Sequence, residues 1–124
     1  DELVGECVGH VLDEARAAPS ARERLEVYLR GIWMIQYNEP AANDVLIRAE
    51  HGSAVSTVLC DRARDAIRSL LSDAQADGSV AGEVTADDVY QLILERGHAL
   101  RAGHRPAVAD YERHIDFTLR ALRP

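Results

Sequence analysis

Hydrophobic side chains recur every three or four residues along most of the chain, which is the spacing of an amphipathic α-helix. The clearest run extends from Ser53 to Ala76, with aliphatic residues on one face and arginines and aspartates mostly on the other. The other helical runs span about residues 2–18, 21–38, 41–50, 86–102 and 106–122. These patterns predict an all-α fold, a helical bundle of about six helices, in one domain that covers residues 1–124.

Residues that start and stop helices stand at the ends of these runs. Pro19 interrupts the first run, and Ser20 is placed to cap the second helix, with Glu23 in position for a capping box. Gly52 closes the short third run, as glycine commonly does at the carboxyl end of a helix. The predicted boundaries therefore rest on turn chemistry as well as on periodicity.

The second run becomes apolar on every side between Gly31 and Ile35, which is typical of a helix buried in the core. Gln36 adds a hydrogen-bonding group where an aliphatic residue would suffice, and such a mixture favours a ligand cavity. The alternative is that the large residues of this helix form a small packed aromatic core, and the sequence alone does not separate the two. The residues expected to line the cavity are Val8, Leu12, Trp33, Met34 and Tyr37.

The same helix suggests what kind of ligand such a cavity would hold. No charged residue falls on its inward face between Gly31 and Tyr37. A charged group of the ligand would therefore lack a partner there, and burying an unpaired charge is costly. The expected effector is a small, largely apolar molecule with a few polar groups.

Composition narrows the functional classes. Hydrophobic residues make up 47% of the chain and aromatic residues only 5%, which favours an aliphatic core carried on helices. The 14 basic residues are all arginines and stand against 21 acidic ones, so the net charge of −7 argues against DNA binding by this chain itself. No apolar run of about 18 residues suggests a membrane span, and the two cysteines give no disulfide framework. We therefore expect a cytoplasmic protein without a membrane partner.

Metal ligation and catalysis find little support in the motifs. Glu95 and His98 form half of the pair of Glu-x-x-His motifs used by di-iron helical bundles, but no second such motif exists. Cys7 and Cys60 lie outside any Cys-x-x-Cys pair, and both are expected to be small core residues rather than a redox pair. We expect no enzyme activity, no cofactor and no metal. The alternative is a helical-bundle enzyme or metal-dependent oxidase that uses Glu95, His98 and His114.

The segment from Leu70 to Tyr90 contains the end of one helix, a glycine stop at Gly78 and a capped helix start at Thr85, with Asp88 three residues on. It follows the pattern Ala-x-x-x-Gly-x-Val, then Val-Thr-x-x-Asp and an apolar helix. This pattern resembles the carboxy-terminal regulatory domain of the TetR, or tetracycline-repressor, family of transcription factors. The resemblance extends in helix order over nearly the whole chain.

The resemblance implies a bacterial, ligand-responsive transcriptional regulator that acts as a repressor. In this family an amino-terminal helix-turn-helix domain binds operator DNA, and the remaining helices bind an effector and join two subunits. The chain would be the second part, so operator DNA would be bound through an amino-terminal domain that is absent from it. A third class, beside regulator and enzyme, is a helical adaptor without a ligand cavity, which a fully packed aromatic cluster would favour.

The last two predicted helices carry an apolar seam at spacings of three and four, more than a single thin bundle is expected to bury. A homodimer with twofold symmetry is therefore predicted. The family resemblance places its interface in a four-helix bundle formed by about residues 85–102 and 106–122 of each subunit. The residues predicted at this interface are Leu92, Ile93, Tyr111, Ile115, Leu119 and Leu122.

Overall fold

The computed structural model describes residues 2–48 and 54–124, which form helices joined by short turns. The helices are α1 (Glu2–Arg16), α2 (Ala21–Asn38), α3 (Pro40–Arg48), α4 (Ala54–Ala76), α5 (Ala86–Arg101) and α6 (Val108–Ala121). No strand occurs in these two ranges, so the predicted all-α bundle of about six helices is confirmed. Within the same ranges, no helix combines the length and the apolar character that a membrane span requires.

The predicted helix limits agree closely with the structure. The first helix ends at Arg16 rather than near residue 18, because the N–H groups of Ala17 and Ala18 bond to carbonyls three residues back and tighten the last turn. Gly52, the predicted stop of the third helix, lies outside the described residues, and so does Ser53, the predicted start of the fourth. Periodicity and turn residues together were therefore sufficient to place the described elements.

Both predicted amino-terminal caps are present. At the start of α2 the Ser20 hydroxyl accepts a hydrogen bond from the Glu23 N–H at 3.1 Å. At the start of α5 the capping box is complete, because the Asp88 N–H donates to Thr85 Oγ1 at 3.0 Å and the Thr85 N–H donates to Asp88 Oδ2 at 2.9 Å. The Thr85 N–H, with its hydroxyl, lowers the pKa of Asp88 by stabilising the ionised carboxylate. Gly78 adopts the left-handed conformation, with φ at +81°, that terminates α4 and begins the turn to α5.

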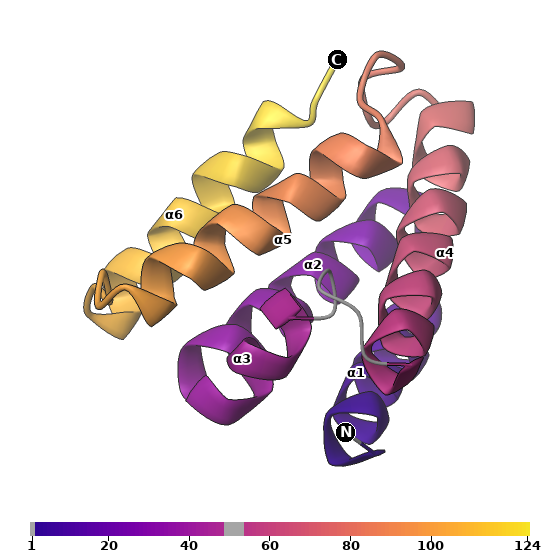
Figure 1. Cartoon of the computed structure of the whole chain (residues 1–124). Helices are drawn as coiled ribbons and strands as arrows, with labels where there is room; N and C mark the ends of the chain where they lie inside the picture. The colour runs from indigo at the N-terminus through magenta and orange to yellow at the C-terminus, as the bar shows by residue number, and fades with distance from the viewer. Residues whose placement is uncertain (1, 49–53) are drawn as a thin grey trace.

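Helix α2 lies at the centre of the bundle and contacts every other helix. In Figure 1, α4 lies on one side of α2 and α5 and α6 lie on the other, while α3 follows at its carboxyl end. The core therefore forms around one helix that is amphipathic in its first half and apolar on every side between Gly31 and Ile35, as its sequence predicts. The core side chains that α2 contributes include Leu25, Tyr28, Leu29, Ile32 and Trp33.

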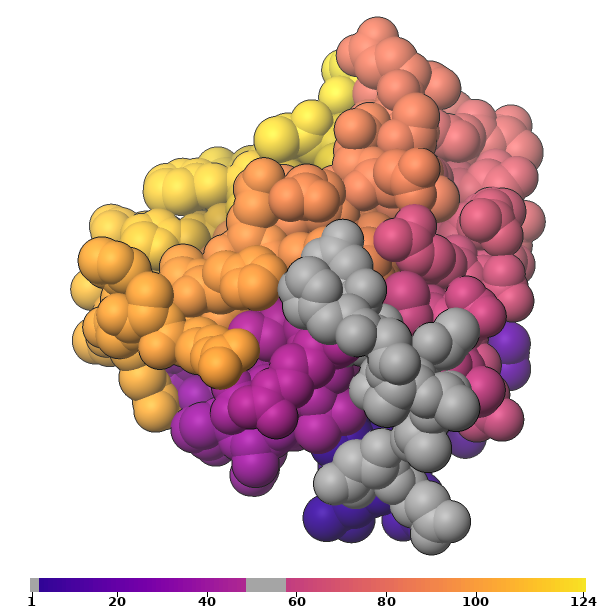
Figure 2. Space-filling model, viewed as in Figure 1, coloured from indigo at the N-terminus to yellow at the C-terminus, as the bar shows by residue number. Residues whose placement is uncertain are grey.

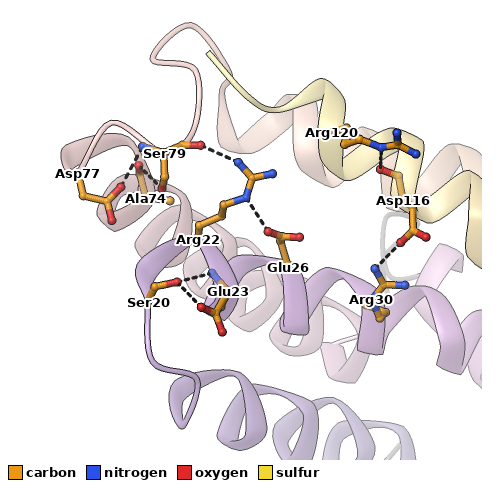
Figure 3. A network of polar contacts seen from close by, with 10 residues as sticks. All are labelled: Ser20, Arg22, Glu23, Glu26, Arg30, Ala74, Asp77, Ser79, Asp116 and Arg120. Carbon is orange, nitrogen blue, oxygen red and sulfur yellow. Dashed lines mark hydrogen bonds and ion pairs between the residues drawn. The ribbon is translucent and has the colours of Figure 1, made fainter.

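Polar contacts join α2 to the turn between α4 and α5 and to α6 (Figure 3). The Arg22 guanidinium lies 2.6 Å from the Glu26 carboxylate and donates to the Ser79 carbonyl at 3.1 Å. Further along α2, Arg30 lies 2.6 Å from Asp116 of α6. Ion pairs exposed to this extent contribute at most about 1 kcal/mol each. They align the turn and α6 along α2 more than they stabilise the fold.

Two buried amide side chains, Gln36 of α2 and Asn43 of α3, join three helices at one point. Gln36 Nε2 donates to Asn43 Oδ1 at 3.2 Å and to the Ile93 carbonyl at 3.0 Å. Asn43 Nδ2 donates to the Gly97 carbonyl of α5 at 2.9 Å. The close approach requires glycine, because a methyl group at Gly97 would lie 2.5 Å from Ile47 Cγ2 and 2.7 Å from Gln36 Nε2.

Replacing Gly97 by alanine should therefore lower the free energy of unfolding by about 1–3 kcal/mol, since the added methyl group overlaps a packed core. The matched control is Gly9→Ala in α1, where a methyl group would meet no atom within 4 Å. That change should raise the free energy of unfolding by up to about 1 kcal/mol, because alanine is the better helix former. Urea denaturation followed by circular dichroism measures both. A stabilising effect of Gly97→Ala would contradict the close approach.

Candidate functional site

A stack of three aromatic rings and two guanidinium groups joins α2, α5, α6 and the 102–107 segment. The Arg105 guanidinium carbon lies 4.2 Å from the centroid of the Tyr37 ring, and the Tyr37 and Tyr111 centroids are 4.5 Å apart. The Arg96 guanidinium carbon lies 5.2 Å from the Tyr111 centroid and 5.0 Å from the Trp33 centroid. Each cation–π contact of this kind contributes about 0.5–2 kcal/mol. The stack therefore helps to hold α6 and the segment before it against α2.

Two tyrosine hydroxyls fix the stack with hydrogen bonds to backbone carbonyls. The Tyr111 hydroxyl donates to the Trp33 carbonyl at 2.7 Å, and the Tyr37 hydroxyl donates to the Pro106 carbonyl at 2.6 Å. Burial raises the pKa of Tyr111 to about 12, so its hydroxyl keeps its proton and remains a donor at neutral pH. These bonds attach both α6 and the preceding segment to the central helix.

A groove of about 310 Å³ lies between α5 and α6, next to this stack. Figure 2 shows α5 in orange and α6 in yellow adjoining along one flank of the molecule. The half-buried Arg96 lines the groove, together with the polar side chains of Glu95, His104 and His114. The volume is at the lower end of the range typical of small-molecule sites. The remainder of the lining is mainly apolar and consists of Leu92, Ala99, Leu100, Pro106 and Tyr111.

Arg96 differs from three of the other four half-buried arginines in having no carboxylate partner among the described residues. Arg22, Arg30 and Arg64 each contact a carboxylate, at 2.6 to 2.8 Å. The fourth, Arg24, donates to the Ala18 carbonyl at 3.0 Å and lies away from the groove lining. Arg96 Nη2 donates to the neutral Thr118 hydroxyl at 3.2 Å, and no carboxylate of the described residues lies within ion-pair distance of it. A half-buried charge without a counterion is unfavourable. The Arg96 guanidinium is therefore suited to an anion from outside the chain.

Two N–H groups of the stack are buried without a hydrogen-bond partner in the part of the chain that the structure describes, namely Arg96 Nε and Trp33 Nε1. An unpaired buried donor costs about 1–3 kcal/mol. Trp33 has no exposed surface, so its N–H could be reached only if neighbouring side chains moved. The region thus combines an uncompensated charge with unsatisfied donors.

The predicted ligand residues are separated in the structure. Val8 lines a gap of about 10 Å³ inside the bundle, which has room for at most one water molecule. Tyr37 lines a different space, a surface groove of about 260 Å³ between α2, α3 and α5. Trp33 is fully buried, and Leu12 and Met34 pack against the core. At Trp33 the structure therefore favours the packed aromatic core over the cavity.

Side chains from α1 and α5 change the environment around the Gly31–Tyr37 part of α2 from the one that its own sequence suggests. Gly31 leaves no open space beside α2, because Val11 of α1 lies so close that a methyl group at Gly31 would overlap its side chain. The face of α2 carries no charge, but Arg96 of α5 places a guanidinium against the Trp33 ring. The expectation of an uncharged, apolar effector considered α2 alone. With Arg96 of α5 beside Trp33, a ligand bound near this helix would also meet a positive charge.

Most residues of the predicted dimer seam are buried within the single chain. On α6 the large hydrophobic side chains that stay exposed are instead Val108 and Phe117. Leu92 is half-buried in the groove lining. The apolar seam is therefore covered without a second copy, contrary to what its spacing suggests. The seam residues that are at most 7% exposed are Ile93, Tyr111, Ile115, Leu119 and Leu122.

The residues of the alternative metal site do not form a metal-binding cluster. Glu95 and His114 line the same groove, whereas His98 is exposed on α5. Among the described residues, no group of three or more His, Cys, Asp or Glu side chains could hold a metal ion. Both cysteines are free, and Cys7 is exposed, contrary to its expected place in the core. Cys60 is half-buried, with its sulfur 3.0 Å from a tyrosine hydroxyl.

Two important residues of this region, Arg96 and Asn43, are not among those singled out from the sequence. Arg96 stands four residues after Leu92 and four before Leu100, so it shares a helix face with them. Asn43 stands three residues before the buried Leu46 and therefore lies on the inward side of α3. A polar residue on an apolar helix face is the signal that would have identified both.

Comparison with known proteins does not assign the chain to a family. No protein-family model, curated protein or solved structure matches it. The functional assignment therefore rests on the residues themselves and on the geometry described above.

Replacing Tyr111 by phenylalanine should lower the free energy of unfolding by about 1 kcal/mol, because the change removes the bond to the Trp33 carbonyl and keeps the ring. Tyr28→Phe is the matched control, since Tyr28 is equally buried but makes no side-chain hydrogen bond within the described residues. The control should change stability by less than about 0.5 kcal/mol. Thermal and urea denaturation would measure both variants. Equal losses would show that the Tyr111 hydroxyl has no specific part in attaching α6.

Proposed function

We propose that this chain is the effector-binding and dimerisation domain of a bacterial, cytoplasmic transcriptional regulator of the TetR type, acting as a repressor. The observation that carries the proposal is the junction between α4 and α5, where the sequence resembles this family. Gly78 and Thr85 have the local conformations that the pattern requires, a left-handed stop and a complete capping box. The order of the helices supports the same assignment.

The charge of the chain supports a separate DNA-binding part. Its net charge is −7, and counterion release from DNA requires several basic side chains that are free to contact phosphates. Many arginines here are already paired with carboxylates. Operator DNA would therefore be bound by a helix-turn-helix domain that precedes residue 1 in the full protein. The arginines within 4 Å of a carboxylate include Arg22, Arg30, Arg64, Arg68, Arg101 and Arg113.

In this proposal the effector acts by changing how α6 packs. Directional contacts that join α6 to α2 are the Tyr111 bond to the Trp33 carbonyl and the pair of Arg30 with Asp116. An effector that binds one arrangement of α5 and α6 more tightly than another shifts the population toward it. Where two copies pair through these helices, the shift alters the spacing of their DNA-binding domains and thus their affinity for the operator.

The exposed face of α6 is the proposed centre of the homodimer interface. Phe117 is 53% exposed, and the guanidinium carbons of Arg113 and Arg120 lie 6.0 and 4.9 Å from its ring centroid. Asp110 lies two turns before Phe117 on the same face of α6, where it pairs with Arg113 at 3.5 Å, whereas Arg120 lies toward the end of the helix. Antiparallel pairing of two copies about a twofold axis would place acidic residues opposite basic ones.

A helical adaptor is the second candidate function, and the packing of Trp33 favours it. Trp33 has no exposed surface, which is the property expected of a core without an internal cavity. The two candidates differ in one respect that can be measured. A sensor domain binds a small molecule reversibly, whereas an adaptor binds another macromolecule through its surface.

Residues 1–124 alone should show no sequence-specific DNA binding at physiological salt, because the chain lacks a cluster of free basic residues. A longer protein that includes the native preceding segment should bind a palindromic site selected from random duplex DNA. Fluorescence anisotropy with labelled duplexes measures both. Specific binding by residues 1–124, or none by the longer protein, would contradict the proposed division of labour.

Light scattering at micromolar concentration should report twice the chain mass of 13.6 kDa. Phe117→Asp should give a folded monomer, because Phe117 is exposed and its replacement leaves the core intact. Val58→Asp, at a 51% exposed position of α4, is the matched control and should remain dimeric. Leu119 is unsuitable for this test, because it is buried and an aspartate there would disrupt the fold. A monomeric parent chain, or a dimer unaffected by Phe117→Asp, would exclude this interface.

A further inference from the structure

We infer that the groove between α5 and α6 binds a small organic monocarboxylate with an apolar body, held through the guanidinium of Arg96. The inference rests on the proposed function in so far as it names the class of effector. The binding itself can be tested on this chain without DNA. Its failure and the failure of the regulator assignment are therefore distinguishable.

The first argument is electrostatic. Arg96 lines the groove, is half-buried, and has no carboxylate partner among the described residues. Its hydrogen-bond partner, the Thr118 hydroxyl, is neutral. In a partly buried site an ion pair with several N–H donors is stronger than the same pair in water. A ligand carboxylate would supply the missing counterion.

The second argument is preorganisation. The Arg96 guanidinium contacts the Trp33 and Tyr111 rings and is bonded to Thr118, so its orientation is already constrained before any ligand arrives. A guanidinium presents a planar fork of N–H donors that matches the two oxygens of a carboxylate. Little side-chain freedom is lost when a constrained fork binds, which favours affinity.

The third argument is the chemistry of the other groove walls. Leu92, Ala99, Leu100 and Pro106 offer apolar surface to the body of the ligand, and about 310 Å³ accommodates a ring or a short chain. Glu95 lines the same groove and repels any anion, a dianion about twice as strongly as a monoanion, so that one ligand charge paired with Arg96 is favoured over two. These walls favour an anion with one charge and an apolar body over inorganic phosphate.

Sodium benzoate is a suitable probe, because benzamide is its neutral counterpart of nearly the same shape. Isothermal titration of the wild-type chain should give a dissociation constant of about 1 mM or tighter for benzoate. Benzamide should bind at least about tenfold more weakly, and so should inorganic phosphate, which lacks the apolar body. Trp33 is the only tryptophan and contacts Arg96, so its emission should change with benzoate and saturate at the same dissociation constant.

Arg96→Met should weaken benzoate binding at least about tenfold, because methionine keeps an unbranched apolar stem and removes the charge. The matched control is Arg68→Met on α4, which removes the same charge from an exposed arginine and should bind benzoate within about twofold of wild type. Circular dichroism establishes that each variant is folded. Should Arg96→Met fail to fold, the ¹⁵N signal of the buried Arg96 Nε–H in the wild-type chain should shift with benzoate and not with benzamide.

Several outcomes would overturn the inference. Unchanged affinity in Arg96→Met, no benzoate binding by the wild-type chain, or tighter binding of phosphate than of benzoate would each do so. Loss of dimer mass in Arg96→Met without benzoate binding to wild type would instead show that the groove seats a second copy. Benzoate binding by a chain whose longer form does not bind DNA would keep the anion site and remove the regulator assignment.

Discussion

The attachment of α6 to α2 is the constraint on which the rest of the candidate site depends. The Tyr111 hydroxyl bonds to the Trp33 carbonyl, a group of the central and most buried helix. Together with the Arg30–Asp116 pair and the buried apolar face of α6, that bond orients the helix, and this orientation gives one wall of the groove, the ring beside Arg96 and the exposure of Phe117. A shift of α6 by one residue would rotate its faces by about 100° and remove all three at once.

The polar groups of the interior fall into two kinds with different consequences. Gln36 and Asn43 bond to one another and to α5 through their N–H groups, and such a network favours one register of three helices over its alternatives. Only the acceptor Gln36 Oε1 of this network lacks a partner among the described residues. Arg96 and Trp33 instead retain donors without partners in the described part of the chain. Natural cores seldom keep unsatisfied groups unless another requirement opposes their removal. For Arg96 that requirement would be anion binding in the adjacent groove. For Trp33 nothing in the structure explains the unpaired N–H.

The helices could be predicted because their signals are local in the sequence. The covering of α6 and the surroundings of Arg96 could not, because they depend on residues that only the fold brings together. The caps at Ser20 and Thr85 depend on residues three positions apart, so the sequence contains everything needed to recognise them. An apolar stripe such as that of α6 shows that a face is buried but does not identify what covers it, and a second copy was therefore predicted at residues that the single chain already buries. The surroundings of Arg96 could not be predicted for the same reason. Its contacts come from Trp33 and Tyr111, which are distant from it in sequence and are brought to it only by the fold.

The bond between Tyr111 and Trp33 joins positions 78 residues apart, and this separation bears on the order of assembly. Closing so long a loop costs more chain entropy than pairing neighbours such as α1 and α2, which a short turn connects. Contacts of low sequence separation are therefore favoured early in folding, and the docking of α6 follows them. The groove exists only once that closure is complete. A fully synthesised but partly folded chain thus carries every side chain that would contact the ligand and still has no site.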